Sequence, residues 1–394
     1  MRLLFVHDHR FLRGADGSVH TVGSFPRSVW QRYLAHFDEI VVVARDGGDL
    51  TAGSDLARSD LPQIRFELVQ QHSLAERLAG IKGEAANIIE REISICDAVL
   101  VRVPSDLGNL AAKLARGAGK PWAGEAVGCA LDGYGNHGSR LSRLYAPLAM
   151  RRMQNVAARS DQMLYVTRQF LQDRYPCTGL TVGVSDVEIE PLSAAEMAAR
   201  TQRLLQIREG RQPVIGTVAS LKVMSKGIQD AIPALAKLKA DGLEPEYRVL
   251  GAGDREPWLA RARAAGVEGN VNFDGTRSSG ARVREWLDQI DLHIQPSYQE
   301  GLPRATVEAM SRGNACIGST AGGLPELIPQ DRIHAPGDIV ALGQLLHAIL
   351  TNPAQLVAAA KADLATSALY LPEAIGQLRD GFYAALADRA RAAA

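Results

Sequence analysis

The sequence predicts an α/β protein built from two doubly wound, Rossmann-like domains. The chain of 394 residues exceeds one ordinary domain, and a hydrophobic content of 46% is sufficient for two buried cores. Short β-branched runs alternate with longer amphipathic runs, which is typical of parallel strands joined by crossover helices. The alternation stops from Pro191 to Gln212 and then begins again, which indicates a second sheet.

The first half contains a series of predicted strands separated by helical patterns. The strand runs are LLFVH, EIVVVAR, IRFELV, DAVLVRV, PWAGEAV and DQMLYVT. Amphipathic patterns predict helices over residues 24–37 and 108–118, among others. We therefore assign residues 1–190 to a first domain and residues 191–212 to a linker.

The second half repeats the same logic with the runs PVIGTVAS, EYRVLG, VNFDG, DLHIQPS and ACIGS. Residues 213–371 form the predicted second domain, and the alanine-rich residues 372–394 form a helix that we expect to pack back on the first domain. Open parallel sheets bind ligands outside the carboxyl ends of their strands. We therefore expect a site in a cleft between two domains that face each other.

Charge and composition exclude several classes of protein. Lysine plus arginine and aspartate plus glutamate both number 44, so no net field favours nucleic acid. The apolar run before His7 is too short for a signal peptide or a membrane span, which predicts a cytoplasmic protein. His7 and His9 lack a ligand partner at metal-site spacing, and the four cysteines form no Cys-x-x-Cys pair, so we expect no metal.

The segment QPSYQEGLPRATVEAM, residues 295–310, places two carboxylates around a strand-to-helix corner. Glu300 precedes the corner, Pro303 suits the first helical turn and Glu308 falls inside the helix. The free backbone amides at such a helix start can bind an anion. A carboxylate, an amide group and a second carboxylate match a sugar, a diphosphate and a ribose in order. Alone, the segment also allows a helix-dipole role for Glu300 and a solvated Glu308.

Together with GNACIGSTAGGLPELI, this segment resembles the donor signature of retaining family 4 glycosyltransferases, which have the GT-B fold. The resemblance is strong over residues 213–330 and weaker over 1–190. It implies that Glu300 contacts the hydroxyls of the transferred sugar and that Glu308 contacts the ribose of a nucleoside diphosphate sugar, which is a co-substrate and not a cofactor. The predicted diphosphate-binding residues at the corner are Gly301, Leu302, Pro303 and Arg304.

Two lysines follow the first strand of the second domain in VASLKVMSKG. Lys226 before Gly227 matches the lysine-glycine pair of the family, and a fixed cation there would stabilise the departing diphosphate. Many members carry an arginine where this chain has Leu221, and Lys222 is the neighbouring substitute. Solvent exposure is the alternative role for either lysine.

Three further positions are predicted near the donor. Gly251 in VLGAGDRE and Thr276 in FDGTR follow successive strands and are candidates for the neighbourhood of the base, although turn geometry alone also explains the glycine. In the first domain, Gly17 lies in HRFLRGADGSVH, where a glycine loop after strand one would cover the phosphates.

Glu125 occupies the strand end KPWAGEAVG, near which family members often have a sugar-contacting histidine, and we predict a catalytic role for it. Arg102 and Ser105 end the adjacent strand, and with His137 they form the predicted acceptor site. Each of these residues also fits a satisfied structural polar group.

Residues 138–160 carry five arginines and no acidic residue, interleaved with leucine, methionine and alanine. Such a segment can lie on an anionic membrane surface or bind a lipid-linked phosphate. A cleft helix with a solvated basic face is the alternative, because Pro147 interrupts the pattern.

The resemblance implies a retaining, metal-independent glycosyltransferase that transfers a sugar from a nucleoside diphosphate sugar to a saccharide or lipid-linked hydroxyl, in surface polysaccharide or glycolipid synthesis. The alternatives are a sugar-nucleotide epimerase or a phosphorylase on the same fold, and a noncatalytic sugar-nucleotide binding protein. The sequence does not determine the donor base, the sugar or the acceptor.

Overall fold

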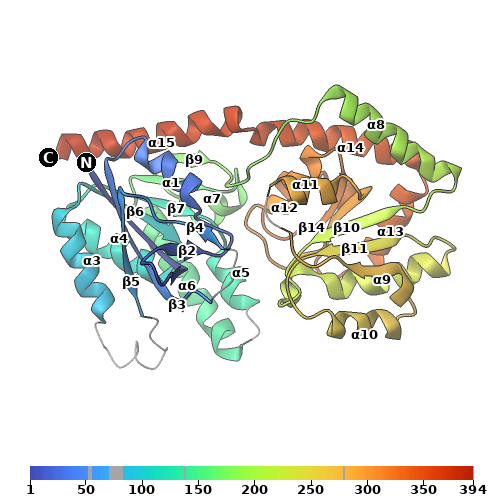
Figure 1. Ribbon diagram of the computed structural model, residues 1–394, viewed down its shortest axis with the longest axis horizontal. Helices are drawn as coiled ribbons and strands as arrows, with labels where there is room; N and C mark the ends of the chain where they lie inside the picture. Colours follow the sequence, from blue (N-terminus) through green and yellow to red (C-terminus); the bar gives the residue numbers. More distant parts are fainter. Residues whose placement is uncertain (52–55, 71–82, 137–138, 278–279, 394) are drawn as a thin grey trace. The chain divides into compact units, whose positions relative to one another are not determined.

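The computed structural model describes residues 1–51, 56–70, 83–136, 139–277 and 280–393 (Figure 1). The chain forms two compact units. Unit 1 comprises Met1–Val184 and Gln377–Ala394, and unit 2 comprises Ser185–Gly376. Each unit contains its own sheet of mainly parallel strands, so the predicted fold class of two doubly wound α/β domains is confirmed.

Unit 1 contains a large sheet and the helices that connect its strands. Its strands are β1 (Arg2–Arg13), β2 (Val19–Thr21), β3 (Glu39–Asp49), β4 (Ala57–Arg58), β5 (Ile64–Val69), β6 (Ala98–Val103), β7 (Trp122–Ala126), β8 (Gln162–Tyr165) and β9 (Leu180–Gly183). Its helices are α1 (Arg27–Leu34), α3 (Glu84–Ile95), α4 (Asp106–Gly117), α5 (Ala130–Gly135), α6 (Arg140–Ala158) and α7 (Phe170–Arg174).

The parallel part of this sheet has the spatial order β5-β3-β1-β6-β7-β8-β9. The chain leaves β1 in one direction through β3 and β5 and returns to the other side of β1 with β6. The strand order therefore reverses between β1 and β6. In doubly wound sheets the carboxyl edge at such a reversal is the usual ligand site.

Strand β1 is longer than the sequence predicts. It continues beyond His9 to Arg13 and pairs with the antiparallel strand β2, with Phe11 opposite Thr21. Gly17 has a φ of +80° and lies in the turn of this hairpin, where its amide donates to Gly14 O. The glycine turn thus follows the first strand, but this strand ends at Arg13 and not at His7 as predicted, because polar residues continue it.

Unit 2 has a smaller sheet. Its strands are β10 (Val214–Val218), β11 (Glu246–Leu250), β12 (Val271–Phe273), β13 (Leu292–Gln295), β14 (Ala315–Ser319) and β15 (Ile333–His334). Its helices are α8 (Ala194–Leu205), α9 (Ile228–Ala240), α10 (Glu256–Ala264), α11 (Ala281–Leu287), α12 (Arg304–Ser311), α13 (Ile339–Leu350) and α14 (Pro353–Ser367). The helix α15 (Pro372–Ala393) begins in unit 2 and continues into unit 1.

The sheet of unit 2 is parallel throughout its described strands, with the order β12-β11-β10-β13-β14-β15. This is the doubly wound order 3-2-1-4-5-6. Gly216 of β10 lies opposite His293 of β13, although the two strands are far apart in the sequence. The carboxyl ends of β10 and β13 therefore meet at the point where the strand order reverses.

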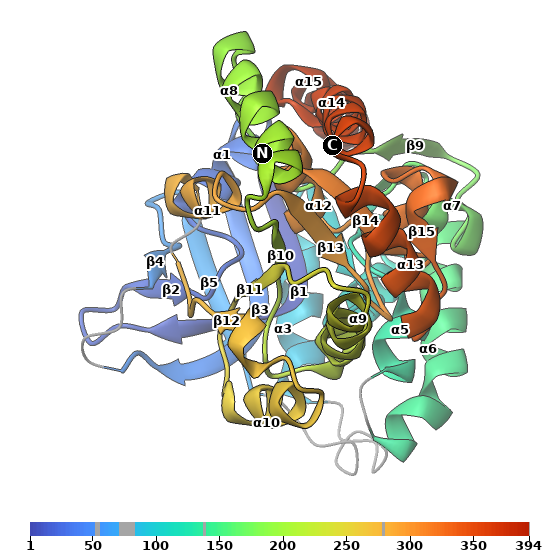
Figure 2. The ribbon, with the colours of Figure 1, turned by 90° about the vertical axis from the view of Figure 1, so that its right-hand side faces the viewer.

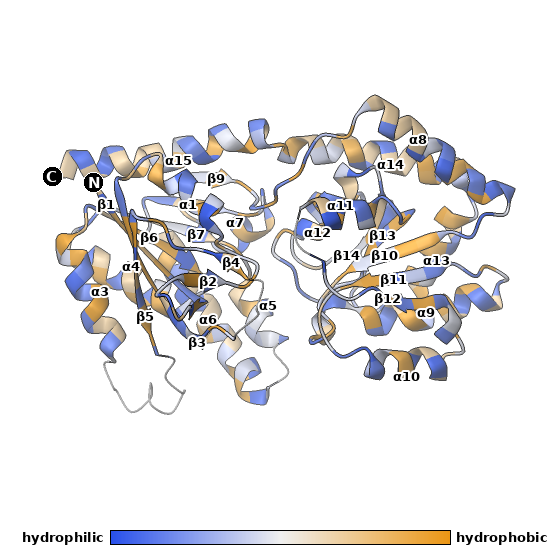
Figure 3. Cartoon of the chain, viewed as in Figure 1, coloured by the Kyte–Doolittle hydropathy of each residue, from blue (hydrophilic) through white to orange (hydrophobic). Residues whose placement is uncertain are grey.

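Helices cover both faces of this sheet. Helices α9 and α10 lie below the sheet in Figure 1 and α13 packs against α9, whereas α11, α12 and α14 pack together above the sheet. Figure 2 shows the strands of unit 2 between these two groups. Figure 3 shows strongly hydrophobic colouring on central strands such as β10 and β13. Buried side chains such as Ile215, Leu235, Ile294 and Leu346 form the core between strands and helices.

The predicted linker at 191–212 differs from the structure, which divides the chain at Ser185. This stretch contains α8, whose first turn carries a capping box of Ser193 and Glu196. Arg200 of α8 is buried and donates to Gly313 O and Asp288 O within unit 2. The polar composition of residues 191–212 suggested a linker. In the structure, however, Arg200 of this stretch donates hydrogen bonds to buried carbonyl groups of unit 2. Residues 377–394 of the predicted terminal helix belong to unit 1.

Candidate functional site

The loop after β10 carries Lys226 at the end of a short 3₁₀ turn, Met224–Lys226. Gly227 follows with a φ of +77°, and a Cβ there would lie 1.9 Å from Pro296 O. Only glycine permits this close approach. The amide of Tyr298 donates to Ser225 O at 2.8 Å, so the loops after β10 and β13 are joined through their backbones.

This junction brings Lys226 and Glu300 together. Glu300 is only 7% exposed, and its Oε1 accepts from Lys226 Nζ at 2.7 Å. The same oxygen accepts from Ser297 Oγ at 2.7 Å and from Gln295 Nε2 at 3.0 Å. Within the described residues, Oε2 accepts from no donor. One carboxylate oxygen thus fixes the side chain, and the other can still accept hydrogen bonds.

The start of α12 adds anion-binding groups beside Glu300. Pro303 is the N-cap, as the sequence places it at the helix start, and Gly313 ends the helix with a φ of +68°. In the part of the chain that the structure describes, the amides of Gly301, Leu302 and Arg304 donate to no backbone carbonyl. The backbone thus places Glu300, three amides without a backbone acceptor and the start of α12 in this order.

Glu308 lies one helical turn further along α12 and is partly buried. No described side chain donates a hydrogen bond to its carboxylate, although Arg304 and Arg284 act on it electrostatically. Burial raises the pKa of Glu308, and the two arginines partly oppose this shift. A carboxylate in this state can gain hydrogen bonds from a ligand without losing any within the protein.

A glycine-rich segment after β14 supports the same corner. The amide of Gly323 donates to Gly301 O at 2.7 Å. Gly322 has a φ of +59°, and a Cβ there would lie 2.2 Å from Glu300 O. This segment approaches the backbone of Glu300 so closely that both positions require glycine. The loop after β14 thus supports Glu300, in addition to the loops after β10 and β13.

Behind the corner, Tyr298 forms a hydrogen bond with Asp230 in the first turn of α9. Asp230 is 5% exposed, and burial raises its pKa while the Tyr298 hydroxyl lowers it. Gly337 leaves room for the Tyr298 ring, because a Cβ there would lie 3.0 Å from the hydroxyl. Sequence reasoning missed Asp230 and Tyr298, since neither belongs to a recognised motif.

The other predicted donor residues of unit 2 lie near neighbouring strand ends. Gly251 packs against the end of β10, where a Cβ would lie 1.8 Å from Ala219 O, and its amide donates to Gly275 O at 2.7 Å. Thr276 is exposed beside this contact. Lys222 is also exposed and lines a separate cavity of about 260 Å³, with Asp254 and Trp258 among its other lining residues. No described contact joins Lys222 to the Glu300 corner.

In unit 1 the structure contradicts a catalytic position for Glu125. This residue is 1% exposed, and its carboxylate accepts from Tyr33 Oη, Tyr383 Oη and Arg102 Nη1 at 3.1, 2.6 and 2.8 Å. Arg102 is likewise buried against Glu125. Ser105 is the N-cap of α4 and accepts from Gly108 N at 2.9 Å. These three residues satisfy each other or the backbone, which is the alternative that the sequence allowed.

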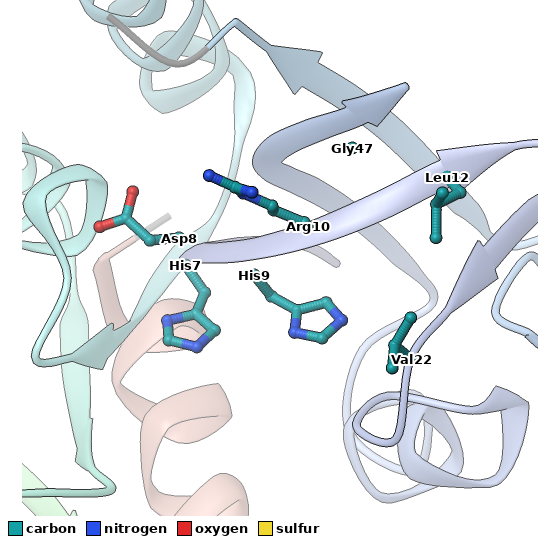
Figure 4. Close-up of a pocket in the computed structure, with 7 residues that line it drawn as sticks. All are labelled: His7, Asp8, His9, Arg10, Leu12, Val22 and Gly47. Atoms are coloured by element: carbon teal, nitrogen blue, oxygen red, sulfur yellow. The ribbon is translucent and has the colours of Figure 1, made fainter. Parts of the chain in front are cut away.

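His137, the remaining predicted acceptor residue, lies outside the described residues. The structure instead shows a cavity of about 540 Å³ along β1 (Figure 4). The imidazoles of His7 and His9 lie on one side of the strand in Figure 4, and the side chains of Asp8 and Arg10 lie on the other. Sequence reasoning assigned the histidines to polar packing and missed this cavity.

The two histidines of this cavity are uncharged at neutral pH. Burial, and next the charge of Arg102, lower the pKa of His7 to about 3 and that of His9 to about 4. His9 Nε2 lies 2.7 Å from Thr21 Oγ1, and His7 Nδ1 lies 3.3 Å from Arg102 O. Neutral imidazoles can both donate to and accept from hydroxyl groups.

No group of three or more histidine, cysteine, aspartate or glutamate side chains among the described residues is arranged to hold a metal ion. None of the described helices is long and apolar enough to cross a bilayer.

The family model described as "Glycosyl transferases group 1" matches residues 212–352. Protein CapJ of Staphylococcus aureus is 30% identical over 352 residues, covering 88% of this chain and 86% of CapJ. The amylovoran biosynthesis glycosyltransferase AmsK of Erwinia amylovora is 32% identical over 181 residues, covering 43% of this chain and 44% of AmsK.

Solved structures share the fold over nearly the whole chain. Sucrose-phosphate synthase from Thermosynechococcus elongatus has a TM-score of 0.70 at 18% identity, covering 98% of this chain and 100% of that one. HepE from Anabaena, in complex with UDP and glucose, has a TM-score of 0.66 at 17% identity, covering 97% and 99%. Two doubly wound α/β units of this kind have the GT-B fold of glycosyltransferases. This chain belongs to the glycosyl transferases group 1 family.

Proposed function

We propose that the protein is a retaining, metal-independent glycosyltransferase, which transfers a sugar from a nucleoside diphosphate sugar to a hydroxyl of a saccharide or lipid-linked acceptor. One observation carries the proposal: Glu300 is anchored by Lys226 through Oε1, and its Oε2 remains open beside the free amides of α12. The name of AmsK supports a role in polysaccharide assembly, and the UDP and glucose bound to HepE support a nucleotide-sugar donor.

The sugar, the diphosphate and the ribose of the donor would bind to successive groups along the corner. The hydroxyls of its sugar donate to Glu300 Oε2, and the diphosphate accepts from the amides of Gly301, Leu302 and Arg304. The ribose diol donates to Glu308, whose carboxylate has no hydrogen bond within the described protein. Since each of these protein groups lacks a partner, donor binding satisfies them without breaking internal bonds.

Catalysis would depend on charge stabilisation. The bond between the anomeric carbon and the diphosphate breaks, and negative charge collects on the leaving diphosphate. Lys226 Nζ is held in place by Glu300, so it can stabilise this charge with little reorganisation. The acceptor hydroxyl attacks from the face of the leaving group and transfers its proton to a phosphate oxygen. This geometry retains the anomeric configuration.

A second cation would be needed for the diphosphate, because Leu221 stands where many relatives of this type carry arginine. Arg304 is exposed in the first turn of α12 and acts electrostatically on Glu308. It is better positioned for this role than Lys222, which lines a separate cavity. We propose Arg304 as the second diphosphate-binding cation and retain Lys222 as the alternative.

For the acceptor, we replace Arg102 and Ser105 of the predicted group with the cavity along β1; His137, its third member, lies outside the described residues. The neutral imidazoles of this cavity, His7 and His9, suit the hydroxyl groups of a saccharide. The cavity lies at the carboxyl side of a doubly wound sheet, which is where such sheets bind ligands.

We also propose that the protein contacts the inner face of the membrane through residues 138–160. On α6, Leu141, Leu144 and Leu148 are 66%, 80% and 47% exposed and repeat at a helical spacing. Arg140, Arg143 and Arg151 are exposed on the same helix. Exposed leucines flanked by arginines fit an anionic membrane surface.

The first test combines donor binding with product analysis. Purified protein is heated with UDP, GDP or ADP, and one base should raise its melting temperature. The corresponding nucleotide sugar is then incubated with candidate acceptors, and transfer should require an acceptor and retain the anomeric configuration, with or without EDTA. A change in the nucleotide sugar without an acceptor would identify an epimerase, and consumption of inorganic phosphate would identify a phosphorylase. Nucleotide binding without any product would indicate a noncatalytic binding protein.

Matched variants make this test specific to the corner. Glu300→Gln preserves shape and should abolish transfer. Glu209→Gln removes an exposed glutamate of unit 2 that has no hydrogen-bonded or ion-pair partner among the described residues, and it should leave transfer unchanged. Equal activity in the two variants would contradict the proposed site.

A further inference from the structure

Helices α4 and α6 of unit 1 enclose a groove of about 460 Å³ that the sugar chemistry does not use. From α4 the groove is lined by Asn109, Lys113 and Arg116, from α6 by Arg152 and Asn155, and from the C-cap of α6 by Arg159. The spacings along each helix place these side chains on one face. The groove also includes Trp122, the first residue of β7, so it extends toward the amino end of a strand, away from the edge where parallel sheets bind substrate.

The groove concentrates positive charge that the described protein does not neutralise. Lys113, Arg116 and Arg159 are exposed and have no ion pair or hydrogen bond with any described side chain. Asp106 is the acidic residue of the lining, and Arg152 approaches it at 3.9 Å. Like charges on neighbouring turns repel each other. A polyanionic ligand would remove this repulsion.

The rest of the lining is apolar. Leu110, Ala112, Trp122 and Val156 form it, and the last three are nearly buried. Guanidinium groups bind phosphate oxygens through pairs of parallel hydrogen bonds. Cations above an apolar floor therefore suit a phosphate group that continues into an apolar part.

The groove is continuous with the exposed leucines of α6. Leu141, Leu144 and Leu148 continue at steps of three or four residues into Arg152, Asn155 and Arg159. The first five residues therefore follow one stripe of the helix, which Arg159 extends at the C-cap, with an apolar half and a cationic half. The leucine half suits lipid chains, and the cationic half suits their headgroups.

We propose that the α4–α6 groove binds the phosphate headgroup of an anionic phospholipid. The lipid source of the phosphate rests on the membrane contact proposed above, whereas the phosphate chemistry rests on the groove itself. The site gives the membrane contact a preference for anionic lipid. It takes no part in the transfer reaction.

The test is cosedimentation of the full chain with two kinds of vesicle, one of phosphatidylcholine alone and one of phosphatidylcholine and phosphatidylglycerol in equal parts. The wild type should bind the anionic vesicles more strongly. A triple variant, Lys113→Gln, Arg116→Gln and Arg159→Gln, should lose about a hundredfold in partitioning to anionic vesicles, since each cation near the surface contributes about fivefold. The matched control, Arg208→Gln, Arg282→Gln and Lys361→Gln, removes the same charges from exposed sites of unit 2 and should bind like the wild type.

Two further variants separate a headgroup site from diffuse attraction and from the membrane contact. The pair Arg116→Lys and Arg159→Lys keeps the charge but removes the guanidinium forks, and it should lose about tenfold on anionic vesicles. Binding equal to the wild type would overturn the site. Leu141→Gln, Leu144→Gln and Leu148→Gln should lose binding to both kinds of vesicle. Loss in this leucine variant with normal binding in both groove variants would preserve the membrane contact and overturn the headgroup site.

Soluble phosphate is the remaining source to distinguish. Titration with inorganic pyrophosphate and glycerol phosphate without vesicles should show only weak binding, because the apolar floor is left unfilled. Tight binding that depends on Lys113 and Arg159 would replace the lipid with a soluble anion and overturn the proposal. Failure of the wild type to bind any vesicle would overturn both the membrane contact and this inference. Throughout, the melting shift with nucleoside diphosphate should remain unchanged, which confirms that each variant is folded.

Discussion

Lys226 Nζ lies 2.7 Å from Glu300 Oε1, although the two residues are 74 positions apart in the chain. The contact follows from the strand order of unit 2, because β10 and β13 are neighbours at the reversal of the sheet. The ion pair is partly buried, with Lys226 30% exposed and Glu300 7% exposed. It fixes a cation beside the carboxylate that we propose for sugar binding.

Replacing Lys226 with methionine should reduce kcat about a hundredfold to a thousandfold, the effect expected when a fixed group that stabilises developing charge is removed. The melting temperature should change little, because Gln295 and Ser297 still donate to Glu300. Steady-state transfer assays measure the first effect, and calorimetry measures the second. Lys361→Met, an exposed change in unit 2, is the control. A variant at Lys226 with wild-type kcat would exclude the lysine from catalysis.

Glu308→Gln should make the ligand-free protein more stable at neutral pH. Burial raises the pKa of Glu308 above its ordinary value of 4.5, so the folded protein favours the neutral carboxyl. A group of this kind contributes stability below its unfolded pKa and loses that contribution as pH rises through its folded pKa. The stability difference between variant and wild type should therefore appear as pH rises from acid to neutral, as urea unfolding at several pH values would show.

The same substitution should weaken nucleotide binding, because a neutral amide accepts less strongly from the ribose hydroxyls than an ionised carboxylate. The ratio of Kd between variant and wild type should increase with pH over the range in which Glu308 ionises. Isothermal titration with the preferred nucleoside diphosphate measures this ratio and cancels the titration of the phosphates. A ratio that is constant with pH would exclude an ionised Glu308 from the ribose site.

Local patterns in the sequence were sufficient for the strands, most helices and the corner of Glu300. Local patterns could not predict the neighbours of Glu125. Tyr33 and Tyr383 are 92 and 258 positions away in the chain, and they bury its carboxylate only in the folded unit. Likewise, β1 continues through polar residues because β2 and β3 pair with it. Pairing and burial over long sequence distances thus decided the predictions that failed.

Glu125→Gln separates a structural from a catalytic role. The amide cannot neutralise Arg102, whose buried charge would lose its ion pair with Glu125, and breaking such a pair costs about 3–5 kcal/mol. The free energy of unfolding, measured in urea, should fall by this amount. Below the melting transition, kcat and KM should stay close to wild type. A large fall in kcat with unchanged stability would restore the catalytic role that the sequence predicts.

Tyr298→Phe should affect both stability and catalysis, because the tyrosine hydroxyl is the hydrogen-bond partner of buried Asp230. Loss of a partner for a buried acceptor costs about 1–3 kcal/mol.

This stability loss should depend on pH. Since the hydroxyl lowers a pKa that burial raises, its removal should raise the pKa of Asp230 further, and the stability loss should increase as pH rises from acid to neutral. The hydroxyl ties the loop that carries Glu300 to α9, so its loss should reduce kcat about tenfold to a hundredfold while nucleotide affinity is kept. In the double variant with Asp230→Asn, the pH dependence should disappear, because no ionisable group remains at that position. A stability loss that is independent of pH in the single variant would show that the hydroxyl does not act through Asp230.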